Sequence, residues 1–410
     1  MRRYLRFVRV TVPDSRRTVV LYIAAGASFA ALSARGLTVP LYAHELGASR
    51  FEVGALFSVS TLAAALLSLP SGVLVDRFGA RALLGTSFVL AAASQLATAF
   101  TPSVPLLFLW QVIGGLAAGA QQAALFSAVT ESTSGSRLGR AMGWLTFSMQ
   151  AGFFLGPSIA GIALRWIDLR MDIGVTTALL LFAAPAAFAA SGTRQHTGRG
   201  LNLRTPLAAL LRNRSFVPVS IGLVAATLVM GTIGAYLPVF GREGLGLPSA
   251  QVGYLLALQA VVNGLSRLPG GRMVDRARQR WPIVFVGVLG WSAACVVLGH
   301  LTGFVGPAIV LAIGTPFIAT AFVAMGVVFG DLSASSTRGV TMGVYGTILF
   351  LGLSIGPLLF GPLVQSFGYA AGFTAAAAVA SALVLVMAAL HAEPLRGRAE
   401  VPLPPPAPGT

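Results

Sequence analysis

Long apolar stretches separated by short polar segments run through the whole chain. A helix needs roughly 17–25 apolar residues to cross a bilayer, and twelve runs of about that length can be read in the sequence. They cover residues 19–42, 52–75, 82–101, 104–128, 139–164, 173–191, 216–240, 250–273, 281–301, 304–329, 339–364 and 369–391. Because a backbone in lipid must satisfy its own hydrogen bonds, each run predicts a helix. The pattern therefore predicts an all-α integral membrane protein with twelve transmembrane helices.

The second half of the chain repeats the first at a spacing of about 200 residues. The segment GVLVDRFGAR at 72–81 returns as GRMVDRARQR at 271–280. A glycine–proline array also occurs twice, as Gly143, Gly152, Gly156, Pro157 and Gly161 and again as Gly343, Gly352, Gly356, Pro357 and Gly361. Such duplication predicts two pseudo-symmetric six-helix bundles. The expected parts are a cytoplasmic tail at 1–18, an N-terminal bundle at 19–191, a cytoplasmic linker at 192–215, a C-terminal bundle at 216–391 and a disordered Pro-rich tail at 392–410.

These two motifs resemble signatures of the major facilitator superfamily. The Asp-Arg turn is similar to the loop 2–3 signature of that superfamily and its echo to the loop 8–9 copy, whereas the glycine–proline array is similar to the helix-5 signature of its drug:proton antiporter-type exporters. The resemblance implies a latch that stabilises the state closed to the cytoplasm, in which Asp76 meets the start of helix 11 near Arg338, and Asp275 meets the start of helix 5 near Arg140. The residues assigned to the latch are Gly72, Asp76, Arg77, Arg81, Asp275, Arg276 and Arg338. The second copy departs from the pattern, because Arg272 replaces a small or apolar residue and Arg278 stands where the first copy has Gly79.

The net charge of +16 could suggest nucleic acid, but its distribution indicates membrane topology. All 28 basic residues are arginines, in a chain that is 56% hydrophobic and only 10% charged. With a cytoplasmic N-terminus, 22 arginines fall on the inner side and four on the outer side. That asymmetry follows the positive-inside rule. We therefore expect a multi-pass protein of the plasma membrane (the inner membrane of a bacterial cell) with both termini cytoplasmic, and no nucleic-acid partner.

Polar residues inside the predicted spans are candidates for a substrate cavity. A charge such as that of Arg35 costs roughly 2.5–3.5 kcal/mol at the centre of a membrane helix. Arg35 should therefore face a cavity, where it would meet an anionic substrate group or a gating partner, or extend to the outer surface. In the eighth span, residues 259, 263 and 267 follow each other at i, i+4 spacing and form one polar stripe. The full candidate set is Arg35, Gln111, Gln122, Gln150, Gln259, Asn263, Arg267 and Tyr345.

Two features bear on proton coupling. Gln111 stands where proton-driven members of the superfamily typically carry an arginine. By the predicted boundaries, none of the twelve acidic residues lies deep in the bilayer, and Glu52 and Glu131 sit at the ends of the second and fourth spans. A proton relay normally uses a buried carboxylate or histidine. The sequence offers only marginal candidates for one.

The sequence argues against an enzyme or an ATP-driven pump. The single cysteine, Cys295, rules out an intramolecular disulfide, and no metal-ligand cluster, phosphate loop or nucleophile motif is present. We expect no metal site and no cofactor. The expected partners are a small-molecule substrate, protons as coupling ion and the lipid bilayer, with the protein acting as a monomer.

The expected function is secondary active transport by alternating access. The resemblance to exporters implies efflux of a small amphipathic or drug-like molecule by proton antiport. An alternative is uptake or facilitated diffusion of an organic anion, for which Arg35 and Arg267 are the motive. A second alternative is a membrane receptor or scaffold that has kept the fold and lost transport.

Overall fold

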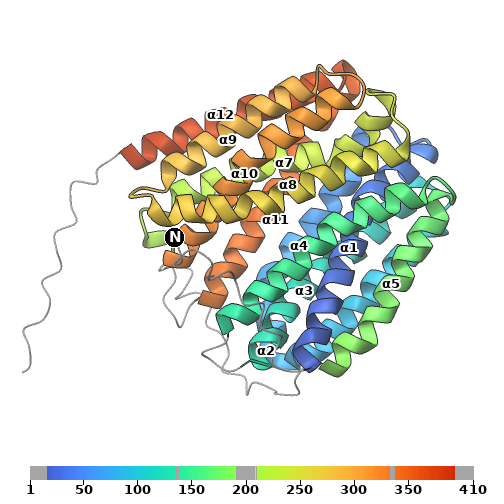
Figure 1. Ribbon diagram of the computed structural model, residues 1–410, viewed down its shortest axis with the longest axis horizontal. Helices are drawn as coiled ribbons and strands as arrows, with labels where there is room; N and C mark the ends of the chain where they lie inside the picture. The colour runs from blue at the N-terminus through green and yellow to red at the C-terminus, as the bar shows by residue number, and fades with distance from the viewer. Residues whose placement is uncertain (1–15, 134–137, 191–207, 209, 333–337, 393–410) are drawn as a thin grey trace, which may run out of the picture.

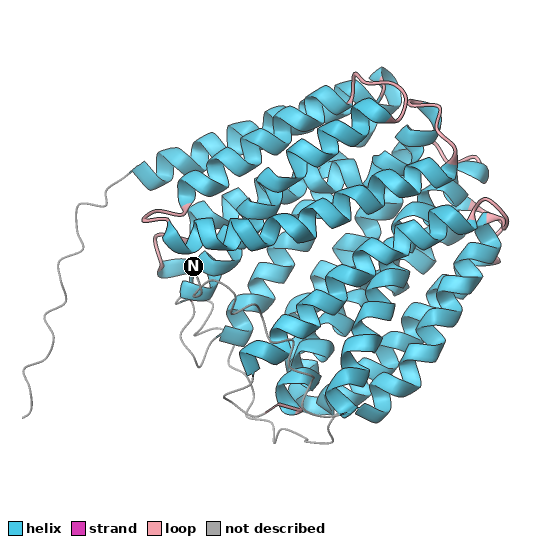
Figure 2. Cartoon of the chain, viewed as in Figure 1, coloured by secondary structure: helices cyan, strands magenta, loops and turns pink. Residues whose placement is uncertain are grey.

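The computed structural model describes residues 16–133, 138–190, 208, 210–332 and 338–392. In that part of the chain all regular structure is helical (Figure 2). The helices are α1 (Arg16–Glu45), α2 (Arg50–Ala99), α3 (Val104–Glu131), α4 (Leu138–Ala163), α5 (Leu169–Ala190), α7 (Phe216–Glu243), α8 (Ser249–Arg276), α9 (Trp281–Leu298), α10 (Val305–Asp331), α11 (Arg338–Phe367) and α12 (Tyr369–Ala392). Every predicted span coincides with one of these helices, since α2 contains both the second and the third.

The long helix α2 is two spans joined at a sharp kink. Gly79 has φ 81° and ψ 150° inside it, a backbone conformation that side chains with a Cβ rarely adopt. In the second copy of the motif Arg278 occupies the matching place, and α8 ends before it, at Arg276. The two copies therefore differ because only the first has a glycine that lets the chain turn and continue as helix.

Local signals also explain where α2 begins. The side chain of Ser49 accepts a hydrogen bond from the backbone N–H of Glu52, and the Glu52 carboxylate accepts one from the backbone N–H of Ser49 at 2.8 Å. This capping box satisfies backbone groups that a helix leaves unpaired at its first turn. The turn before it uses Gly47 at φ 84°. The short link between α1 and α2 is thus set by residues 47–52.

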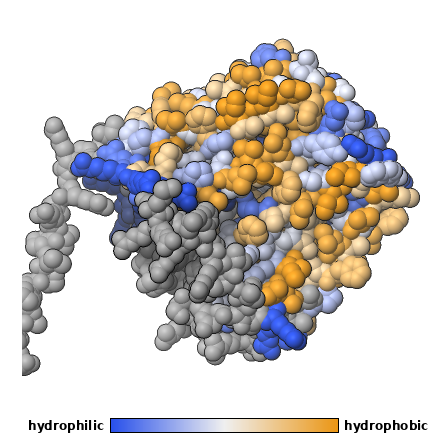
Figure 3. All heavy atoms as spheres, in the orientation of Figure 1, coloured by the Kyte–Doolittle hydropathy of each residue, from blue (hydrophilic) through white to orange (hydrophobic). Residues whose placement is uncertain are grey.

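The outer surface is that of a membrane protein. Within the described residues, ten helical segments are long and apolar enough to cross a bilayer. The helix α8 is not one of them, because its polar stripe lowers its mean hydropathy. Large apolar side chains such as Phe182 are exposed on the helices, as a lipid-facing surface requires, and they cover much of the face in Figure 3. The predicted fold class, an all-α multi-pass membrane protein, is confirmed.

The helices form two groups that lie side by side (Figure 1). Helices α1–α5 pack on one another, as do α7–α12, and α2 against α11 and α4 against α8 join the groups. We call α1–α5 the N-terminal half and α7–α12 the C-terminal half. The predicted tails and most of the predicted linker at 192–215 lie outside the described residues, so these domain boundaries stay a prediction.

The duplicated glycine–proline array packs the same helix pair in each half. A Cβ at Gly152 would lie 2.8 Å from the backbone nitrogen of Ala30 on α1. In the other half, a Cβ at Gly352 would lie 3.4 Å from the Cα of Val224 on α7. Gly156 and Gly356 meet α1 and α7 in the same way. These glycines let α4 approach α1, and α11 approach α7, more closely than a side chain would allow.

Candidate functional site

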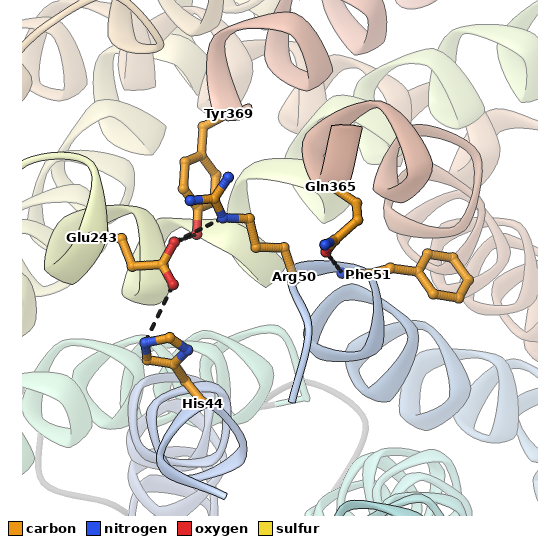
Figure 4. Close-up of polar contacts among 6 residues, drawn as sticks. All are labelled: His44, Arg50, Phe51, Glu243, Gln365 and Tyr369. Atoms are coloured by element: carbon orange, nitrogen blue, oxygen red, sulfur yellow. Dashed lines mark hydrogen bonds and ion pairs between the residues drawn. The ribbon is translucent and has the colours of Figure 1, made fainter. Parts of the chain in front are cut away.

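At one end of the molecule, charged and aromatic side chains join the two halves (Figure 4). The Arg50 Nε at the start of α2 donates to the Glu243 carboxylate at the end of α7, at 2.8 Å. The His44 Nε2 lies 3.3 Å from the other oxygen of Glu243. The Tyr369 hydroxyl donates to Glu243 at 2.8 Å, and the Arg50 guanidinium stands 4.9 Å from the centre of the Tyr369 ring. Glu243 of the C-terminal half therefore holds two basic side chains of the N-terminal half.

Further contacts between the two halves lie at the same end. The backbone N–H of Phe51 donates to the Gln365 side chain at 3.3 Å. The Arg165 guanidinium donates to the Tyr254 hydroxyl at 2.8 Å, linking the ends of α4 and α8. Gly161 packs directly on Gly253, so that α4 and α8 touch backbone to backbone. We call this region the closed end; it is formed by residues 44–51, 161–165, 243–254 and 361–369.

The helices α4 and α8 separate toward the opposite end. They diverge in Figure 1, and a Cβ at Gly143 near the start of α4 or at Gly271 near the end of α8 would meet no atom within 4 Å. In contrast, α2 and α11 are in contact near this end too, since a Cβ at Gly343 would lie 3.7 Å from the Cα of Leu69. The two halves are thus closed at one end and parted between α4 and α8 at the other.

Arg35 and Gln111 from the candidate set are brought together in the N-terminal half. The guanidinium of Arg35 on α1 donates to the Gln111 side-chain oxygen on α3. Both residues are buried, with exposed fractions of 8% and 4%. Gly114 lies against the guanidinium, where a Cβ would stand 2.8 Å from the Arg35 Cζ. The structure thus rejects the alternative in which Arg35 extends to the surface.

Three candidates of the C-terminal half also come together. Arg267 donates to the Asn263 side-chain oxygen at 3.1 Å, one turn earlier on α8. Tyr345 of α11 lies close enough to interact electrostatically with Arg267, and its ring meets Phe329 edge to face at 5.2 Å. All three candidates are half-buried. The predicted stripe on α8 therefore faces α11 at its Arg267 end.

The remaining cavity candidates are half-buried and unpaired. Within the described residues, the side chains of Gln122, Gln150 and Gln259 make no hydrogen bond to protein. Among the described residues no hydrogen bond joins them to the Arg35 pair or to the Arg267 group, although Gln259 lies one turn before Asn263 on α8. Their place in a substrate cavity stays a prediction.

The latch predicted at the Asp-Arg turns is only partly described. The side chains of Asp76, Arg140 and Arg338 lie outside the described residues. Arg81 stacks on the Phe188 ring at 4.2 Å, which ties the turn to α5, and Arg77 lies over the ring of Phe78 at 5.3 Å.

The other latch positions face open space. Asp275 and Arg276 are exposed. A Cβ at Gly72 would meet nothing within 4 Å. In this conformation no described helix therefore packs closely against Gly72.

Sequence reasoning missed Asp172. The predicted sixth span begins at 173, so that this acid was placed outside it, but α5 begins at Leu169 and includes it. Asp172 is 1% exposed, and its Oδ2 has no hydrogen-bond partner in the described part of the chain. Because the predicted span begins four residues after the start of α5, the sequence analysis did not include this buried carboxylate among the residues inside the membrane.

The sequence also gave no reason to single out the closed end. His44, Arg50, Glu243 and Tyr369 stand at helix ends, where charged and aromatic residues are common in membrane proteins. Only the pairing of helices far apart in the chain brings them together.

As for metals, no three His, Cys, Asp or Glu side chains gather in the described residues in a way that could hold an ion.

Curated relatives of this chain are transporters. An uncharacterised MFS-type transporter of Methanocaldococcus jannaschii is 23% identical over 339 residues, which cover 80% of this chain and 86% of the relative. The human chromaffin granule amine transporter is 22% identical over 78% of this chain, which spans 61% of that protein's length. The quinolone resistance protein NorA of Staphylococcus aureus is 25% identical over 123 residues, 30% of this chain and 32% of NorA.

Solved structures with the same fold are transporters as well. The nucleoside transporter NupG superposes with a TM-score of 0.76, covering 92% of this chain and 99% of NupG at 12% identity. A POT family transporter in complex with 5-aminolevulinic acid superposes with a TM-score of 0.75, covering 91% and 95% at 12% identity. At this identity the likeness concerns the fold alone.

A family profile covers nearly the whole sequence. The profile of the Major Facilitator Superfamily matches residues 21–317 and 242–408. It agrees with the duplicated motifs, the apolar helices and the transporter relatives. The chain therefore belongs to the Major Facilitator Superfamily, and it is a multi-pass membrane transporter of a small molecule rather than an enzyme.

Proposed function

We propose that this transporter exports a small amphipathic organic molecule by alternating access, driven by proton antiport. The observation that carries the proposal is the unequal contact between the two halves. They are tied together by Glu243 at the closed end, whereas α4 and α8 part toward the other end. Rocking of 19–191 against 216–391 would break the first contact and close the second gap, which is how transporters of repeated architecture expose a site alternately to each side.

The orientation of this cycle comes from the arginine asymmetry. With both termini cytoplasmic, the closed end faces outward, and the end at which α4 and α8 diverge faces the cytoplasm. This conformation would receive a substrate from inside the cell across its plasma membrane. The array around Gly156 and Pro157 and the partial similarity to a quinolone resistance protein support export.

Asp172 supports proton coupling. Among the described acidic residues, it combines burial with a carboxylate oxygen that has no partner. Acidic groups enclosed in membrane proteins serve as proton carriers in pumps and transporters. The sequence analysis found only marginal groups for that task, and the helix boundary at Leu169 supplies a better one.

The proposal is tested by flux into inverted membrane vesicles that carry the full chain. The vesicle interior is made acidic, and a panel of fluorescent dyes, drugs and organic acids is added outside. We expect accumulation of at least one amphipathic compound that stops when an ionophore collapses the gradient. Vesicles without the protein provide the background.

Other outcomes would replace the proposal. Flux that ignores the gradient would indicate a uniporter or another coupling ion. Absence of flux for every compound, with the protein inserted at normal abundance, would favour a receptor or scaffold.

A further inference from the structure

Arg35 is a buried cation without an anion. In the described part of the chain it forms no ion pair, and the Gln111 side-chain oxygen is its one hydrogen-bond acceptor. Buried charges in proteins are normally paired, because leaving water is costly for an ion without a partner. The arginine fork can donate several more hydrogen bonds. Arg35 therefore lacks the acceptor that its charge and geometry call for.

Gln111 adds a second unused donor at the same place. Only the amide oxygen can accept from arginine, so the Arg35 bond fixes which way the amide lies. The Gln111 Nε2 is enclosed and has no hydrogen-bond partner among the described residues. Buried side-chain donors are rarely left unpaired. Two neighbouring groups, one charged and one neutral, thus lack acceptors.

Gly114 makes room for the Arg35 guanidinium beside Gln111. It lies one turn after Gln111 on α3, and a Cβ there would stand 2.8 Å from the Arg35 Cζ. A side chain at 114 would overlap the guanidinium and displace it from Gln111. The bare backbone of α3 therefore allows Arg35 and Gln111 to meet.

We infer that Arg35 and Gln111 form a subsite for an acidic group, a carboxylate or sulfonate, on the transported molecule. Oxyanions accept several hydrogen bonds at once and match the planar fork of arginine. The inference rests on the proposed transport function and narrows its substrate to amphipathic acids. In this subsite the side-chain oxygen of Gln111 positions Arg35, and the side-chain nitrogen of Gln111 donates to the oxyanion.

Arg267 does not offer the same arrangement. It is half-buried, its acceptor Asn263 lies on its own helix, and Tyr345 stands nearby. Within the described residues, no enclosed amide nitrogen beside it lacks a partner. The acid subsite is therefore placed in the N-terminal half.

The test measures binding to the purified full-length protein by thermal unfolding, because a ligand that binds the folded state raises the melting temperature. The probes are 1-naphthoate, naphthalene-1-sulfonate and octanoate, each compared with its neutral amide. We expect the acids to stabilise the wild type and the amides to do so much less. In Arg35→Gln the affinity for the acids should fall by roughly tenfold or more, the usual effect of losing a charged hydrogen bond.

Three further variants separate the subsite from simple loss of charge or folding. Gln111→Leu and Gly114→Ala keep Arg35 and should each weaken acid binding about fivefold. Arg170→Gln is the matched control, because it removes an exposed arginine that lies over Tyr42, and acid binding should be unchanged. The inference is overturned if no acid stabilises the wild type, or if acids stabilise Arg35→Gln equally well.

Flux separates this inference from the transport proposal. Vesicles that accumulate neutral amphipathic probes but neither bind nor transport the acids would keep export and overturn the subsite. Arg35-dependent acid binding in a protein that moves no compound would keep the subsite and overturn export.

Discussion

The Asp172 carboxyl is the residue on which proton coupling depends in the proposed cycle. It is 1% exposed, whereas Asp168, just before this helix, and Arg170 in its first turn are exposed. Asp172→Asn keeps the shape and removes the ionisation. We expect the variant to equilibrate substrate across vesicles and to lose accumulation driven by a proton gradient.

The matched control for that variant is Asp168→Asn. Asp168 accepts a hydrogen bond from the backbone N–H of Met171 at 2.7 Å, and asparagine can accept it as well. Gradient-driven accumulation should therefore be unchanged in the control. Accumulation at the wild-type rate by Asp172→Asn would show that the coupling proton binds elsewhere.

At the closed end, Arg50 and Glu243 form an ion pair whose interaction energy can be measured with single and double variants. The pair is partly solvated, with side-chain exposures of 37% and 22%, so we expect it to stabilise the closed end by about 1 kcal/mol or less. Arg50→Gln and Glu243→Gln should each alter the transport rate a few-fold. The effect of the double variant on the transport rate should be smaller than the two single effects combined, because each single variant already breaks the same ion pair. Strict additivity in this cycle of variants would mean that the pair does not act as a unit.

At the residue scale, the sequence predicted which side chains are unusual and not which ones meet. Arg35 and Gln111 were both candidates, because polar groups are rare inside membrane helices. Their pairing depends on how α1 packs against α3, and 76 residues of chain separate them. Glu243 carried no such signal, because acids at helix ends are ordinary. Its role appears only when α7 meets α1, α2 and α12.

At the element scale, the glycine array serves packing at some positions and not at others. A Cβ at Gly152 would lie 2.8 Å from the Ala30 nitrogen, while one at Gly143 would meet nothing within 4 Å. We expect Gly152→Ala to destabilise the protein by about 2 kcal/mol through overpacking. Gly143→Ala should be neutral or stabilise it by about 0.5 kcal/mol, since alanine restricts the unfolded chain.

Thermal unfolding in detergent measures both effects, and flux is recorded beside it. A Gly143→Ala variant with normal stability and no transport would show that this position serves motion. Equal stability of the two variants would show that the approach of α4 to α1 does not depend on the glycine.

The helices themselves were predictable because the bilayer sets their length and composition. The kink at Gly79 was not predicted, and neither was the absence of contact at Gly72. The first depends on a backbone conformation that glycine permits without requiring it. The second depends on the conformation that the transporter occupies, since a latch at one end is not needed while the other end is closed.

At the scale of the whole molecule, the proposed cycle requires the closed end to open. A Cβ at Gly161 of α4 would lie 3.6 Å from the Cα of Ala250 on α8, which brings cysteines at these positions within reach of a disulfide. The same Cβ would lie 2.9 Å from the Gly253 Cα, so the reduced double variant, which already carries this overlap, is the reference for the oxidised one. We expect Gly161→Cys with Ala250→Cys to lose transport on oxidation and to regain it on reduction. The buried native Cys295 is replaced by alanine in the background to avoid unintended pairing.

A cross-link within one half distinguishes loss of rocking from loss of flexibility. A Cβ at Gly26 of α1 would lie 3.9 Å from the Cβ of Ser148 on α4, which is within the Cβ–Cβ range of a disulfide. Both helices belong to the N-terminal half and would move together, so Gly26→Cys with Ser148→Cys should transport normally when oxidised. Transport by the oxidised 161–250 pair at the wild-type rate would mean that substrate does not leave between α4 and α8 at the closed end. If both cross-links stopped transport, the N-terminal half would have to deform internally during the cycle, and rigid-body rocking would be the wrong description of this transporter.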